Sequence, residues 1–252
     1  MKNKSVNHIS YAVVLGSIFA LWWLVLAFNV FDRKDWMLEN LLSVVAVVYL
    51  CFTARRFPLS RVSYTLLFLF LCLHEVGAHY TYAEVPYDRW FEAVFGQTFN
   101  SLVGWDRNNF DRIVHFCYGL LLAYPIREVF LRIAQVKGFW GYFLPLDVTM
   151  STSMLYELVE WIVAEVFGGE LGMAYLGTQG DIWDAHKDMG LASLGALVAM
   201  LVTAGINLYL QRDFAHEWAA SLRVKENLPL GEDEIKRMLQ SRDSNGPQPN
   251  QT

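Results

Sequence analysis

Long hydrophobic blocks that are nearly free of charge constrain the fold of this 252-residue chain more than any other feature. Each block runs for about 20 residues, the length that a helix needs to cross a hydrocarbon core about 30 Å thick. A membrane interior offers no water to bond the backbone, so such segments must be helical. The sequence therefore predicts an all-α, polytopic transmembrane bundle and excludes a soluble globular enzyme. The six predicted spans cover residues 10–31, 36–53, 62–79, 111–131, 140–166 and 184–210.

Lys and Arg residues are distributed unequally between the two sides of this predicted bundle. With the N-terminus inside, 14 of the 20 basic residues fall on the inner side. Short basic loops are retained in the cytoplasm. We therefore expect both termini to be cytoplasmic and, in a bacterial source, a multi-pass protein of the cell inner membrane. Residues 211–252 form a predicted cytoplasmic tail with helical stretches at 213–223 and 232–241 and with disorder from about residue 244.

Charge and cysteine content exclude several further classes of protein. The net charge is −5, and no basic patch stands clear of the membrane flanks, which argues against a nucleic-acid partner. Cys51, Cys72 and Cys117 lie inside apolar blocks without Cys-x-x-Cys spacing, so we interpret them as buried thiols. The expected partners are the lipid bilayer and a lipid-linked or small-molecule ligand.

Ionisable side chains are concentrated at the predicted outer ends of four spans. An acid and a histidine four residues apart share one face of a helix, as Glu75 and His79 do, and as Asp111 and His115 do. Charged groups at membrane depth usually face the bundle interior or a watery cavity. The sequence therefore predicts a polar cavity open to the outside. Its candidate residues are His74, Glu75, His79, Asp111, His115, Glu157, Glu160, Asp181, Asp184 and Asp188.

The first interpretation of this cavity is a metal site. Imidazole and carboxylate groups on facing helices supply metal centres in helical bundles and suit zinc, manganese or iron. A bound metal can activate water for hydrolysis at the membrane surface. The predicted metal ligands are His79, His115, Glu157 and Asp184. The predicted catalytic carboxylates are Glu157, Glu160 and Asp188, and the residues expected to support the ligands are His74, Glu75, Asp111 and Asp181.

Two other interpretations remain open. In a proton- or ion-coupled transporter, Glu157, Glu160 and Asp147 would form a relay along one span. In a purely structural network the charges neutralise one another and fix the helix packing. Glu160, next to an interfacial tryptophan, is individually expected to be a solvated helix end. The ion pairs expected in the structural network join Asp111 to Arg107 or Arg112, and Lys187 to Asp181 or Asp184.

Four stretches of the chain resemble the YjdF family of bacterial inner-membrane proteins. They are HEVGAHYTY at residues 74–82, DRIVHF at 111–116, YELVEW at 156–161 and GTQGDIWDAHKDM at 177–189. The resemblance implies a membrane fold and an inner-membrane location but no particular reaction. A more distant similarity, through residues 111–116, Glu157 and residues 184–190, is to VanZ-like membrane proteins. It would imply an envelope role in handling cell-wall or lipid intermediates.

Overall fold

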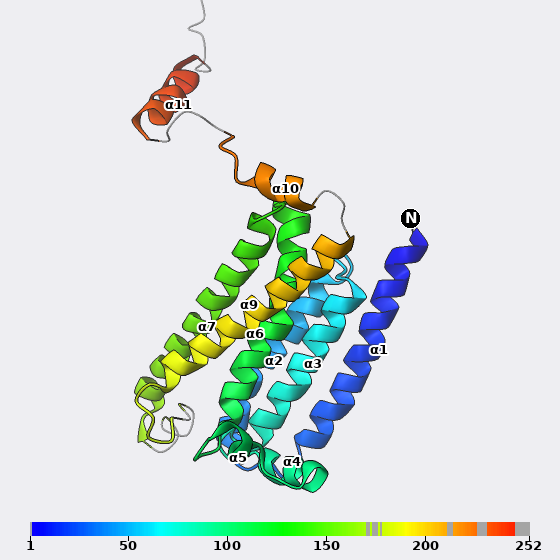
Figure 1. Cartoon of the computed structure of the whole chain (residues 1–252), viewed down its shortest axis with the longest axis vertical. Helices are drawn as coiled ribbons and strands as arrows, with labels where there is room; N and C mark the ends of the chain where they lie inside the picture. The colour runs from blue at the N-terminus through cyan, green and yellow to red at the C-terminus, as the bar shows by residue number, and fades with distance from the viewer. Residues whose placement is uncertain are drawn as a thin grey trace, which may run out of the picture.

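The computed structural model describes residues 2–169, 172, 176, 178–210, 214–225 and 231–244. Within these residues all regular secondary structure is helical, which confirms the all-α fold class (Figure 1). The long helices are α1 (Lys2–Leu26), α2 (Arg33–Thr53), α3 (Arg61–His79), α6 (Phe110–Val129), α7 (Trp140–Phe167) and α9 (Asp184–Leu210). The short ones are α4 (Tyr87–Phe95), α5 (Phe99–Val103), the π-helical turn η1 (Phe130–Ala134), α10 (Phe214–Ser221) and α11 (Glu232–Ser244).

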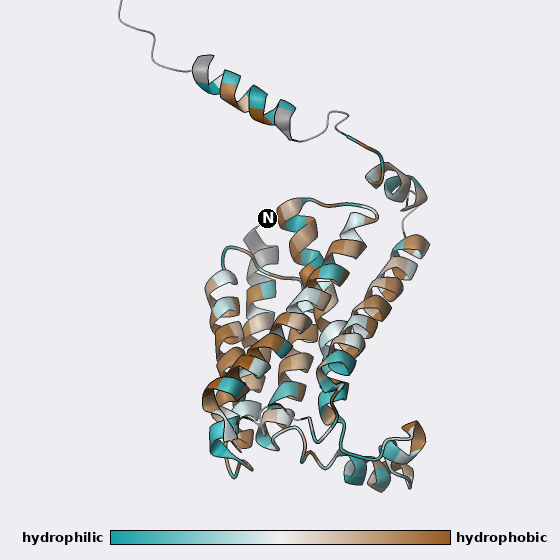
Figure 2. Ribbon diagram, turned by 90° about the vertical axis from the view of Figure 1, so that its left-hand side faces the viewer, coloured by the Kyte–Doolittle hydropathy of each residue, from teal (hydrophilic) through white to brown (hydrophobic). Residues whose placement is uncertain are grey.

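Five helical segments of the described chain are long and apolar enough to cross a membrane. They are His8–Leu26, Arg33–Thr53, Arg61–His79, Phe110–Ala134 and Asp184–Leu210. Figure 2 shows hydrophobic residues along the long helices of the bundle and mainly hydrophilic residues in α11. Helix α7 has 28 residues but is not among the five, and it carries four carboxylates along its length. The sixth span therefore stays a prediction.

The first helix ends earlier than predicted, and a capping aspartate starts the second helix earlier than predicted. The hydropathy pattern places the end at residue 31, whereas α1 ends at Leu26. Asp32 is the N-cap of α2, and its carboxylate accepts hydrogen bonds from the backbone N–H groups of Lys34 at 2.7 Å and Asp35 at 3.0 Å. An N-cap of this kind satisfies donors that have no partner inside the helix. Helix α2 therefore begins at Arg33 and not at residue 36, because of a cap that hydropathy does not register.

The tightest packing of the described bundle is between α6 and α9, which touch through small residues. A Cβ atom added to Gly119 would lie 1.9 Å from the carbonyl oxygen of Ala192. A Cβ atom added to Gly195 would lie 2.1 Å from the carbonyl oxygen of Phe116. Small residues at such contacts let the helix backbones approach closely, which drives association where lipid removes the hydrophobic effect. The crossing fixes the relative position of the side chains nearby on both helices.

The connections at the two ends are more ordered than the hydropathy pattern predicts. The segment between α3 and α6 contains α4 and α5, held together by a hydrogen bond from the Tyr87 hydroxyl to Asn100 at 2.6 Å. At the opposite end, α10 meets the start of α7, where Ser221 Oγ accepts a hydrogen bond from the Phe139 N–H at 2.9 Å. Helices α10 and α11 overlap the two predicted tail helices. The disorder predicted from residue 244 concerns residues 245–252, which lie outside the described residues.

Candidate metal centre

Helices α4 and α5 lie at one end of the bundle (Figure 1). Most of the buried ionisable side chains belong to the segments that meet at this end. They come from the start of α2, the end of α3, the start of α6, the second half of α7 and the start of α9. Ionisable groups at this depth are costly unless they bind a partner or serve a function. The buried ionisable members are Asp35, Glu39, His74, Glu75, His115, Glu160, Asp184 and Asp188.

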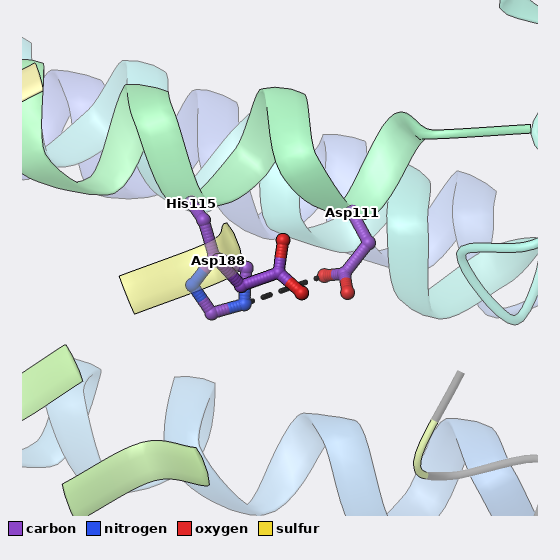
Figure 3. Close-up of side chains that lie close together, drawn as sticks. All are labelled: Asp111, His115 and Asp188. Atoms are coloured by element: carbon purple, nitrogen blue, oxygen red, sulfur yellow. Dashed lines mark ion pairs between the residues drawn. The ribbon is translucent and has the colours of Figure 1, made fainter. Parts of the chain in front are cut away.

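Three of the predicted residues converge between α6 and α9. Asp111, His115 and Asp188 each offer a ligand atom, and these three atoms all lie within 4.8 Å of one another (Figure 3). Asp111 and His115 are one turn apart on α6, and Asp188 approaches from α9. Within the residues that the structure describes, this is the one group of three such side chains at metal-binding distance. One imidazole and two carboxylates form a donor set suited to zinc, manganese or iron.

The three side chains of this cluster differ in their exposure to solvent, from Asp111, the most exposed, to Asp188, the most buried. The side chain of Asp111 is 26% exposed, and that of His115 is 8% exposed. Asp188, at 2%, is almost completely buried. A small cation could therefore enter past Asp111, whereas the deeper ligands would be held in a largely dry environment. Dryness strengthens electrostatic interactions with a bound ion.

Helix α7 adds a carboxylate to the same cluster. Glu157 Oε1 lies 3.5 Å from His115 Nε2, the same distance that separates this nitrogen from Asp111 Oδ1. Glu157 Oε1 and Asp188 Oδ1 are buried, and neither accepts a hydrogen bond from the described part of the chain. Buried carboxylate oxygens are almost always hydrogen-bonded or bound to a cation. Glu160, expected as a solvated helix end, is buried at 8% exposure because it follows the inward face of α7; that expectation was wrong.

Two predicted site residues, Asp181 and Asp184, bind arginines instead. Asp184 accepts hydrogen bonds from Arg107 and, at 3.2 Å, from Arg112. Asp181 pairs with Arg112 and with Lys187, each at 2.5 Å. Among the described residues the ion pairs of Arg107 and Arg112 are with these two acids, and the expected ion pair with Asp111 is not formed. The expected pairing of Lys187 with Asp181 is present. Asp184, a predicted metal ligand, therefore has its carboxylate paired with Arg107 and Arg112. These ion pairs connect the start of α6 to the start of α9.

Acid is expected to weaken this network. The Lys187 ammonium, followed by the Trp183 backbone N–H, holds the pKa of Asp181 well below the ordinary aspartate value of about 3.9. Because the folded-state pKa is depressed, the stabilisation is fully present above about pH 4 and is lost as the pH falls towards the folded-state pKa. The melting temperature in detergent should fall across that window, and the fall should be shallower in Asp181→Asn. Parallel pH profiles for the two proteins would contradict this role of Asp181.

His79, a predicted metal ligand, lies outside the cluster and fastens two connections. Its Nδ1 donates to the carbonyl oxygen of Leu26 at 2.7 Å, and its own carbonyl oxygen accepts from the Phe31 N–H at 3.0 Å. His79 thus joins the end of α3 to the segment between α1 and α2. The four-residue spacing in the sequence places Glu75 and His79 on the same face of α3. It does not show that the His79 imidazole points towards the end of α1.

His74 and Glu75 are both buried beside α2. Burial raises the pKa of the Tyr82 hydroxyl well above its ordinary value, so this group stays protonated and donates to His74 Nδ1. The Nε2–H of His74 then donates to the carbonyl oxygen of Glu39 at 3.2 Å. Both nitrogens of His74 are therefore used in hydrogen bonds. Glu75 is fully buried and interacts with Ser43 and Asn40, although no contact meets hydrogen-bond geometry.

Helix α2 contributes polar residues that the hydropathy pattern conceals. Asp35, Glu39, Asn40 and Ser43 are all buried on one side of this helix. The Tyr156 hydroxyl of α7 donates to Glu39 Oε2 at 3.4 Å, so α2 reaches the neighbourhood of the cluster. The signal in the sequence is the four-residue spacing of Asp35 and Glu39, which marks one helix face. It is easily missed because the rest of the segment is apolar.

The proposed transporter relay does not follow one face of α7. Asp147 is exposed on the outside of the bundle, whereas Glu160 is buried. Thr149 and Ser153, not Asp147, share the inward face with Glu160. A continuous line of titratable groups along this helix is therefore not present among the described side chains.

Comparison with known proteins identifies the family. Residues 11–208 match the family described as predicted membrane protein (DUF2238). The chain is 38% identical to inner membrane protein YjdF of Escherichia coli (strain K12) over 174 residues, which is 69% of this chain and 79% of that relative. No solved structure matches the chain. The chain therefore belongs to the DUF2238 family of membrane proteins and is a relative of YjdF.

Proposed function

We propose that this protein binds one divalent cation between α6 and α9 and uses it on a small polar or lipid-linked ligand of the cell envelope. The observation that carries the proposal is the convergence of Asp111, His115 and Asp188 within 4.8 Å. Three protein ligands leave a coordination position for water, as in catalytic zinc sites. Zinc, manganese and iron fit this donor set better than copper(I), which prefers sulfur.

Glu157 is the best candidate for a proton acceptor at this site. It is close to His115, at 3.5 Å, and its Oε1 has no hydrogen-bond donor among the described residues. A cation lowers the pKa of water bound to it, and a neighbouring carboxylate can then take the proton. This chemistry corresponds to hydrolysis. Glu160, buried one turn further along α7, would make the electrostatic potential at the site more negative and so favour a cation.

The proposed location is the cell inner membrane, with six spans, cytoplasmic termini and the cation site at the outer face. It is supported by the excess of Lys and Arg at the other end of the bundle and by the likeness to an inner membrane protein. An ion-coupled transporter is the less favoured function, because Asp147 is exposed on the outside of α7.

Elemental analysis of detergent-purified protein tests the proposal. Wild type loaded with zinc, manganese or iron and then dialysed should retain about one equivalent of metal. His115→Ala and Asp188→Asn should each lose most of it. Each removes a metal ligand, which should lower the affinity by more than the roughly 10–100-fold that the loss of a second-sphere partner costs. His79→Ala should keep the metal, because His79 binds Leu26. His186→Ala, an exposed histidine on α9, is the matched control. Metal that survives both cluster substitutions, or no metal in wild type, would overturn the proposal.

A further inference from the structure

A cavity of about 720 Å³ lies between α1, α2 and α3, separate from the cation site. Val13 and Phe19 of α1, Val47 of α2, and Leu67 and Phe68 of α3 are among the apolar residues that line it. The volume is within the range of about 300–1,000 Å³ that is typical of small-molecule sites. The lining is almost entirely apolar, and the space is partly open to the surroundings. The walls therefore suit a hydrocarbon chain.

Most polar atoms along this cavity are already engaged within the protein. Ser17 Oγ donates to the carbonyl oxygen of Val13 at 2.9 Å, and the Tyr64 hydroxyl accepts the Leu59 N–H at 3.2 Å. The indole N–H of Trp23 donates to Asn40. The exception is Ser43, whose almost fully buried Oγ has no hydrogen-bond partner among the described residues. An occupant consequently needs few polar groups along the length of the cavity.

One end of the cavity has a different character, because Arg55 lines it there. Its guanidinium is exposed and forms no ion pair or hydrogen bond with the residues that the structure describes. Arg61, from the adjoining start of α3, lies over the ring of Tyr11 at 5.5 Å. A guanidinium binds phosphate strongly through paired N–H groups. An apolar channel that ends at an unpaired arginine is complementary to an amphiphile with an anionic head.

We propose that this cavity binds one acyl chain of an anionic phospholipid from the surrounding bilayer, with the headgroup phosphate on Arg55. The lipid is the occupant best supplied by a membrane, and basic residues at the end of a span attract anionic lipids. The headgroup site does not depend on the cation: Glu39 is the α2 residue that reaches towards the metal cluster, and Arg55 follows the other end of α2 at Thr53, about 20 Å further along the helix axis. The lipid would fill the space between α1 and α2.

Two variants test the chain and the headgroup separately. Gly16 lines the cavity, and a Cβ atom added to it meets nothing within 4 Å, so Gly16→Leu fills the space without backbone strain. Arg55→Gln removes the charge. Gly205→Leu on α9, also unobstructed, and Arg56→Gln, an exposed neighbour that does not line the cavity, are the matched controls.

The measurement is photo-cross-linking in full-length protein reconstituted into phosphatidylcholine vesicles. The vesicles contain a trace of phosphatidylglycerol or phosphatidylcholine with a photoreactive group on the acyl chain, and labelled peptides are identified by mass spectrometry. We expect phosphatidylglycerol to label α1–α3 peptides about fivefold more than phosphatidylcholine. Gly16→Leu should abolish this labelling, Arg55→Gln should remove the preference, and the controls should retain both. Equal labelling by the two lipids, or labelling that Gly16→Leu leaves unchanged, would overturn the proposal.

Discussion

Replacing Gly119 by alanine is expected to destabilise the bundle by about 3 kcal/mol and to empty the cation site in the same step. The added Cβ atom would lie 1.9 Å from the Ala192 carbonyl oxygen and 2.6 Å from the Ala196 backbone nitrogen. Both contacts are backbone atoms that cannot rotate away, so α6 and α9 must separate. Asp111 and His115 move with α6 and Asp188 with α9, and the three ligand atoms would no longer meet.

Melting temperature in detergent and bound zinc per protein measure this effect together. Gly190→Ala on α9 is the matched control, because a Cβ atom there meets nothing within 4 Å. Alanine is a better helix former than glycine by about 1 kcal/mol, so this control should be neutral or slightly stabilising. A Gly119→Ala protein that melts with the wild type and keeps its zinc would show that the close crossing does not hold the site.

Replacing Arg112 by glutamine is expected to destabilise the metal-free protein by about 3 kcal/mol. The side chain of Arg112 is only 12% exposed, and it pairs with Asp181 at 2.5 Å and with Asp184 at 3.2 Å. The guanidinium also interacts electrostatically with Asp111 and Asp188 of the cluster. Without the Arg112 guanidinium, these partly buried carboxylates repel one another with less positive charge nearby to offset the repulsion.

A divalent cation should restore part of the stability that Arg112→Gln loses. Ligand binding to the folded state alone stabilises it by about 2.7 kcal/mol at a concentration 100 times Kd. The variant has the more negative site and should bind zinc more tightly, so zinc should raise its melting temperature more than that of the wild type. Arg89→Gln, an exposed arginine near the same end, is the control and should behave as wild type. If zinc raised the melting temperatures of Arg112→Gln and wild type equally, the charge of Arg112 would have no effect on cation binding, which would contradict this prediction.

Hydropathy and spacing predict the helices of this protein well but not their limits. The apolar blocks give the long helices because a membrane leaves the backbone no other way to satisfy its hydrogen bonds. The start of α2 depends instead on the Asp32 cap, and α4 and α5 depend on local contacts such as that between Tyr87 and Asn100. These interactions are made by single side chains, which leave little trace in a windowed hydropathy pattern.

The sequence also indicates which end of the bundle gathers acids and histidines, but it does not indicate which side chains meet. Spacing places Asp111 with His115 on one face of α6; it cannot show that Asp188 joins them while Asp184 binds Arg107 and Arg112. That choice is made by the rotation of α9 against α6, which the packing at Gly119 and Gly195 determines. Distances between helices therefore had to come from the structure.

X-ray absorption at the zinc edge of the loaded wild-type protein tests the cation site most directly. The account predicts a shell of nitrogen and oxygen atoms at about 2.0–2.2 Å, with the multiple scattering of one imidazole and no sulfur at about 2.3 Å. In His115→Ala any residual zinc should lack the imidazole signal. A sulfur shell, two imidazoles, or an imidazole signal that persists without His115 would contradict a site built from Asp111, His115 and Asp188.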